Sequence, residues 1–161
     1  MNVALSLNQI NSQNIGLLES KTNIVMEQGK FTKINFLDDS FTMNGLYILF
    51  PISSYTVDCT NNRKNMKFQS NSLPNSSHAK DLIKLESRIL DFYISNKQKE
   101  YKKSFLLKKQ IESGFMKIYR ENNSYLFQSH FVYILKISGI WESDGEIGIT
   151  YKLFESNSIS S

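Results

Sequence analysis

The pattern Phe-Met-Lys-Ile-Tyr in one strand-like segment separates two kinds of side chain. If Met116 and Ile118 point into a core, the other three side chains point away from it, because side chains alternate between the two faces of a strand. Phe115, Lys117 and Tyr119 then offer a ring, a cation and a second ring. Bases stack on such rings with about 1–3 kcal/mol per base, while the ammonium group contacts phosphate. This segment is therefore our first candidate for a nucleic-acid-binding site.

Other basic and aromatic side chains occupy comparable outward positions in the strands predicted around this segment. The alternative is that the aromatic rings fill a second small core and that the lysines only keep the surface soluble. The alternation depends on the register, since a slip of one residue exchanges the two faces of a strand. The complete candidate set for binding nucleic acid is Tyr47, Arg63, Lys64, Lys67, Phe115, Lys117, Tyr119, Arg120, Lys136 and Lys152.

Catalytic chemistry has less support in the sequence. His78 and His130 are the only histidines, and neither lies in a metal-binding spacing. Cys59 alternates with apolar strand residues, and we interpret it as buried. Glycine-rich phosphate loops and nucleophile-elbow motifs are absent. We therefore predict a protein that is not an enzyme and needs no cofactor.

One metal-dependent alternative stays open. Asp38, Asp39, Asp58, Asp144 and Glu146 could meet around magnesium, as carboxylates do in nucleases. Turn chemistry explains the first two and Asp144 without any metal, because aspartate is common in turns. We accordingly predict no metal ligands.

The positive charge is concentrated in the middle of the chain. The net charge is +4, but residues 60–120 contain 14 Lys and Arg against 5 Asp and Glu, whereas the remaining residues contain 5 against 10. A localised positive region attracts polyanions. The lysines in residues 97–109 form an electrostatic arm, a nuclear targeting patch or a solvated helix surface, and the sequence does not decide between these roles.

Length and composition indicate one intracellular domain. A chain of 161 residues with 40% hydrophobic residues can bury a stable core. The single cysteine excludes an internal disulfide and favours a reducing compartment. We find no secretory signal and no apolar run of membrane-spanning length. We therefore expect the protein in the cytoplasm or nucleus, with no membrane partner.

The order of predicted elements is strands, then a helix, then strands. Leu82, Leu85, Ile89 and Phe92 recur at helical spacing after an N-cap at Ser76 or Ser77, and this predicts a helix that ends near Tyr93. Gly114 is the predicted end of a second, short helix. We predict strands at residues 31–37, 45–52, 55–59, 66–69, 115–120, 125–128, 131–142 and 147–153.

The last two predicted strands carry the clearest patterns. Phe131, Tyr133, Leu135, Ile137 and Trp141 share one parity, which predicts that all five face the core. The Asp-Gly pair at 144–145 predicts a tight turn between the last two strands. Residues 115–120 and 125–128 could form another hairpin.

This order favours a mainly β fold, namely a small oligonucleotide-binding barrel with a helix between its third and fourth strands. Other barrels, or a β-sandwich with an inserted helix, give the same order. We expect an N-terminal arm or edge strand at residues 1–30, one domain at 31–155 and a disordered tail at 156–161.

Part of the chain resembles small proteins of large eukaryotic DNA viruses and related virus-like elements, some of which are thought to bind single-stranded DNA. The resemblance lies in residues 137–142 and 148–152, with smaller matches at 85–86, 89–90 and 50–51. It implies an oligonucleotide-binding barrel that coats single strands during viral replication or recombination. Related phage proteins recruit partners through an acidic C-terminal tail, which this Ser-rich tail lacks.

The sequence therefore predicts sequence-tolerant binding of single-stranded DNA, or of RNA, in replication or recombination, by a monomer or a homo-oligomer. The alternative is a protein-interaction or virion structural module whose outward aromatic rings contact protein.

Overall fold

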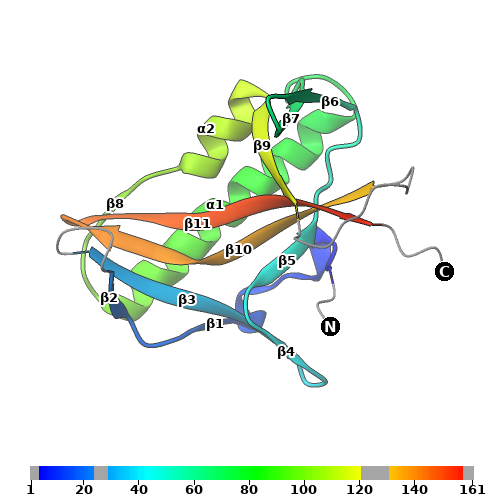
Figure 1. The fold of residues 1–161 in the computed structure, drawn as a ribbon. Helices are drawn as coiled ribbons and strands as arrows, with labels where there is room; N and C mark the ends of the chain where they lie inside the picture. Colours follow the sequence, from blue (N-terminus) through cyan, green and yellow to red (C-terminus); the bar gives the residue numbers. More distant parts are fainter. Residues whose placement is uncertain (1–3, 24–28, 121–130, 158–161) are drawn as a thin grey trace.

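The chain folds into one mixed β-sheet with two helices on one side of it (Figure 1). The computed structural model describes residues 4–23, 29–120 and 131–157. Two short 3-10 helices, η1 (Leu7–Gln9) and η2 (Ser12–Asn14), precede the sheet. The strands and α-helices are β1 (Ile15–Leu17), β2 (Lys21–Asn23), β3 (Gly29–Leu37), β4 (Thr42–Met43), β5 (Leu46–Leu49), β6 (Tyr55–Thr60), β7 (Arg63–Phe68), α1 (Asn75–Lys97), β8 (Lys102–Lys103), α2 (Leu106–Ser113), β9 (Phe115–Arg120), β10 (Phe131–Ser143) and β11 (Glu146–Asn157).

The sheet has the strand order β1-β3-β10-β11-β9-β7-β6. Strands β2 and β4 also pair with β3, β5 pairs with β10, and β8 and β9 run parallel to β11. The prediction of a mainly β protein with one or two helices is confirmed. In the described residues the sheet ends at β1 and β6 and does not close into a barrel. The predicted position of the helix after the third strand is wrong, because seven strands precede α1.

The long hairpin β10–β11 forms the centre of the sheet. Its turn has positive φ at Asp144 (49°) and Gly145 (76°), so the predicted turn is confirmed. The register shifts between Ile137 and Gly139, where a β-bulge reverses the parity of β10. Trp141 therefore lies on the face opposite to Ile137, and its predicted place in the core is wrong.

Helix α1 packs its apolar stripe on the sheet. Leu82, Leu85 and Ile89 are almost completely buried, and they follow the predicted helical spacing. The helix is longer than predicted, because it continues to Lys97 and ends where Gln98 adopts a left-handed conformation (φ 52°). No helix among the described residues is long and apolar enough to cross a membrane.

The N-terminal residues belong to the same sheet. Strands β1 and β2 pair with β3, and Leu5, Ile10 and Ile15 are buried in the common core. The predicted partner strand of residues 115–120, at residues 125–128, lies outside the described residues. Among the described residues, strand β9 pairs with β7 and β11.

A buried carboxylate joins the two helices. Glu86 of α1 accepts hydrogen bonds from the backbone N–H groups of Leu107 (3.0 Å) and Lys108 (2.8 Å) in the first turn of α2. These N–H groups have no partner within α2, because the first turn of a helix leaves its donors free. Burial nevertheless raises the pKa of Glu86, and the hydrogen bonds only partly oppose this effect.

Glu86 should make stability depend on pH. The pKa of Glu86 is higher in the folded than in the unfolded chain. Its contribution to stability is therefore complete at pH values below the unfolded-state pKa and is lost as the pH rises through the folded-state pKa. We expect the free energy of unfolding of the wild type, relative to Glu86→Gln, to fall as pH rises above about 4.5. Urea unfolding of both proteins across this range measures the difference, and parallel pH profiles would contradict the assignment.

Candidate nucleic-acid interface

The two faces of the sheet differ in what covers them. One face carries Ile118, Leu135 and Leu153, which are buried in the core under α1 and α2. Neither helix covers the other face, which we call the open face (Figure 1). Side chains that alternate with the core residues along β5, β7, β9, β10 and β11 belong to it.

Strand β9 has the predicted alternation. Met116 and Ile118 are 1% and 4% exposed, whereas Phe115 is 43% exposed. Lys117 is also exposed and Tyr119 is half-buried. The ring, cation and ring of this strand therefore lie together on the open face.

Tyr119 is the centre of a small cluster of rings and ammonium groups. The Nζ atoms of Lys117 and Lys152 lie 4.6 and 4.9 Å from the centre of its ring. The ring of Phe154 lies 6.1 Å away, because Phe154 is the neighbour of Tyr119 in the parallel pairing of β11 with β9. Sequence reasoning missed Phe154, although it has the parity of Lys152.

The cluster continues across the sheet to β10 and β5. Lys152 pairs directly with Lys136, which pairs in turn with Tyr47. The Nζ atom of Lys136 lies 5.1 Å from the centre of the Tyr47 ring, and the Tyr47 hydroxyl donates to the Oδ1 atom of Asn44 (3.0 Å). Tyr47 is only 9% exposed, so it supports Lys136 and offers little free surface for stacking. We call Tyr47, Lys136, Lys152, Phe154, Lys117 and Tyr119 the aromatic–lysine row.

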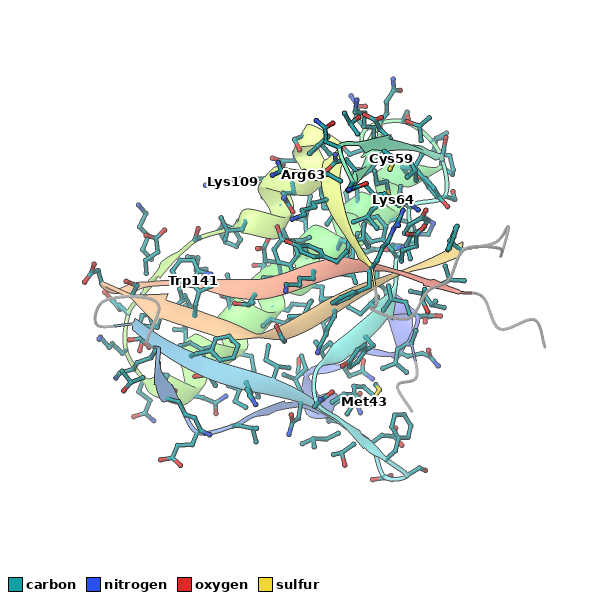
Figure 2. The ribbon with its side chains drawn as sticks, in the orientation of Figure 1. Met43, Cys59, Arg63, Lys64, Lys109 and Trp141 are labelled. Carbon is teal, nitrogen blue, oxygen red and sulfur yellow. The ribbon has the colours of Figure 1, made fainter. Side chains whose placement is uncertain are left out.

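A second group of rings on the open face was missed by sequence reasoning. Trp141 pairs with Phe31 on β3, beyond the bulge. Both rings lie directly on glycines, because a Cβ atom at Gly148 would come within 2.5 Å of Trp141, and one at Gly139 within 2.5 Å of Phe31. Figure 2 shows Trp141 near the turn of the hairpin, away from Lys64 on β7. The sequence signal that could have found these rings is a glycine inside each of two predicted strands, Gly139 and Gly148, since such a glycine often marks the close approach of another group.

Two candidate residues lie on the helix-covered face. Lys64 forms an ion pair with Glu155 (2.7 Å), and the Nε atom of Arg120 lies 3.6 Å from the same carboxylate. Glu155 is 3% exposed, so these cations neutralise a buried charge. The structure therefore does not bring Lys64 and Arg120 together with the aromatic–lysine row.

The two remaining candidates, on β7, are exposed and face the open side. The Nζ atom of Lys67 lies 3.5 Å from Asp58 on β6, which partly satisfies its charge. Arg63 is exposed beside the turn between β6 and β7 (Figure 2). They extend the positive surface towards the edge of the sheet.

The lysines of the aromatic–lysine row have aromatic rings as neighbours. Among the described residues no carboxylate oxygen lies within 4.0 Å of Lys117, Lys136 or Lys152. Lys136 and Lys152 are direct cross-strand neighbours, an arrangement in which like charges repel. An anion bound on the open face would relieve this repulsion.

The residues considered for catalysis are dispersed. Asp38 accepts a hydrogen bond from the backbone N–H of Ser40 in one turn, and Asp144 forms another turn. No group of three or more potential metal ligands occurs in the described part of the chain. His130 lies outside the described residues, and His78 borders a hollow of about 390 Å³ beside α1. Cys59 is exposed, so its predicted burial is wrong.

Comparisons with models of protein families, with curated proteins and with solved structures gave no significant match. The interpretation of the open face therefore depends on its geometry alone.

The different surroundings of the lysines predict different effects on stability. Lys64→Ala removes the closest cation from a buried carboxylate and should lower the free energy of unfolding by about 2 kcal/mol. Lys117→Ala, the matched control, should change it by less than about 0.5 kcal/mol, since Lys117 is exposed. Urea unfolding at neutral pH measures both values. Equal effects of the two substitutions would show that the pair with Glu155 has no structural role.

Proposed function

We propose that this protein binds single-stranded DNA through the open face of its sheet, with little preference for sequence. The observation that supports this most strongly is the gathering of Lys117, Lys136 and Lys152 against aromatic rings, without a carboxylate partner in the described residues. Phosphates would neutralise the ammonium groups, and bases would stack on the exposed rings. No metal or cofactor takes part in this binding.

The geometry of the aromatic–lysine row, and of Phe115 on the same face of β9, suggests how a nucleic-acid strand would bind. Phe115 is the most exposed ring of β9 and can accept a base without rearrangement. The ring of Tyr119 has two ammonium groups close to it, so a stacking base would displace one of them. A displaced lysine reaches a phosphate by rotation of its flexible side chain. Stacking and charge neutralisation would therefore occur in the same step.

The cellular role is part of the same proposal. A protein that coats single strands in this way would act in replication or recombination of DNA inside the cell, and a viral setting is part of the proposal. A relation to oligonucleotide-binding barrels also belongs to the proposal. It is supported by a mainly antiparallel sheet with a long helix packed on one face.

Binding should depend on Lys117 and Tyr119. Fluorescence anisotropy of a labelled oligothymidine, titrated at low salt without metal, should show submicromolar binding by the wild type. Lys117→Ala combined with Tyr119→Ala should weaken binding by about ten-fold or more, because it removes one stacking ring and one cation that neutralises phosphate. Lys109→Ala on α2 is a control of equal charge to Lys117→Ala and should have a much smaller effect.

The salt dependence separates the proposed interactions from general attraction. Each lysine that neutralises a phosphate should account for about 0.7 of the slope of log affinity against log salt, so Lys117→Ala should reduce the slope by about that amount. No binding at low salt would refute the proposal and favour a protein-interaction module. Degradation of the oligonucleotide only with magnesium would favour a nuclease.

Trp141 provides an independent signal for the binding face. It is the only tryptophan of the chain, and it lies on the open face. Oligothymidine should therefore change the intrinsic fluorescence of the protein, with the same affinity as in the anisotropy titration. Binding with unchanged fluorescence, together with unchanged affinity of Lys136→Ala with Lys152→Ala, would place the nucleic acid elsewhere.

A further inference from the structure

We infer that the edge strand β6 pairs with β6 of a second copy of this protein. Strand β6 is the last strand of the sheet and pairs only with β7 among the described residues. All six of its residues are exposed, including Tyr55 (37%) and Val57 (38%). An exposed edge strand with free backbone groups is a template for pairing with another strand.

The turn of the β6–β7 hairpin determines which backbone groups are free. Thr60 and Arg63 flank the two-residue turn at Asn61 and Asn62, which both have positive φ. The pair that flanks such a turn is hydrogen-bonded, and hydrogen-bonded pairs recur at every second residue. The N–H and C=O groups of alternate β6 residues therefore point outward. These residues are Tyr55, Val57 and Cys59.

The order of side chains makes an antiparallel pair of β6 strands self-complementary. When Val57 lies opposite Val57 of the second copy, Tyr55 lies opposite Cys59, and all outward backbone groups find partners. Thr56 then lies opposite Asp58, so a hydroxyl meets each carboxylate. A register centred on Asp58 would bring the two carboxylates together, which is unfavourable. The register centred on Val57 is therefore preferred.

The edge has little protection against such pairing. Asp58 is the only charged residue of β6, and Lys67 of the same chain lies 3.5 Å from its carboxylate. Outward charges, prolines or bulges usually protect natural edge strands against such pairing. Two six-residue strands bury less area than the roughly 1,200–2,000 Å² of a stable interface. The dimer is therefore weak in dilute solution and is favoured where copies are concentrated.

The pairing has a consequence for the binding surface. A two-fold axis perpendicular to the sheet leaves both open faces on the same side, because residues of equal parity face each other. The open faces of two copies then form one continuous surface across β6. Pairing of β6 does not require nucleic acid, and only this continuous binding surface rests on the proposed function.

Disulfide crosslinking of the full chain without nucleic acid tests the pairing and its register. Val57→Cys with Cys59→Ser places two thiols in a hydrogen-bonded pair about 5.5 Å apart between Cα atoms, which a disulfide can span. Mild oxidation should convert most of this variant into a covalent dimer. Asp58→Cys with Cys59→Ser is the matched control, because its thiols would lie about 8 Å apart, beyond the usual limit.

A third variant uses the native cysteine. Tyr55→Cys with Cys59 retained should give a dimer with two disulfides, whereas the wild type, with its Cys59 residues about 14 Å apart, should stay uncrosslinked. Circular dichroism confirms that each variant is folded. Absence of dimers for both Val57→Cys and Tyr55→Cys, or equal crosslinking of the Asp58→Cys control, would overturn the inference. Oligothymidine binding by an uncrosslinked, monomeric protein would leave the proposed function intact.

Discussion

The register of the β10–β11 hairpin determines the arrangement of the whole sheet. Asp144 and Gly145 form its turn, and the pairing continues from Ser143 with Glu146 to the far end of both strands. Strands β3 and β5 attach to the outer side of β10, while β8 and β9 attach to β11. A shift of this register by one residue would move every paired side chain to the other face.

The bulge between Ile137 and Gly139 links the core to the open face. On one side of the bulge Leu135 and Ile137 point to the helices, and on the other side Ile140 and Glu142 do so. Glu142 thereby accepts a hydrogen bond from the buried Tyr93 hydroxyl of α1 (2.8 Å). The burial of Tyr93 and this hydrogen bond raise the pKa of the tyrosine to about 12. The same shift in parity places Trp141 on the open face.

Local patterns in the sequence predicted the features that depend on neighbouring residues. The alternation around Lys117, the helical spacing from Leu82 and the turn at Asp144 each need only a few adjacent side chains. The sequence signal for the bulge was weak, because a lone glycine in a strand, here Gly139, marks a bulge or a close contact and does not distinguish the two. The ion pair of Lys64 with Glu155 was equally hidden, since it joins residues 91 positions apart. Very short strands such as β2 and β4 give almost no periodic signal.

The positive charge left available on the open face depends more on the groups around each cation than on the number of cations. Glu155 neutralises the charge of Lys64 within the fold, and Asp58 partly neutralises the charge of Lys67. A cation–π contact with an aromatic ring stabilises the position of an ammonium group by about 0.5–1 kcal/mol at an exposed site, and it does not neutralise the charge. Among the described residues Lys117 and Lys152 are positioned by Tyr119 without a carboxylate partner, so their charge is free for the anion that we propose binds there. A lysine with a carboxylate partner would first have to break that ion pair.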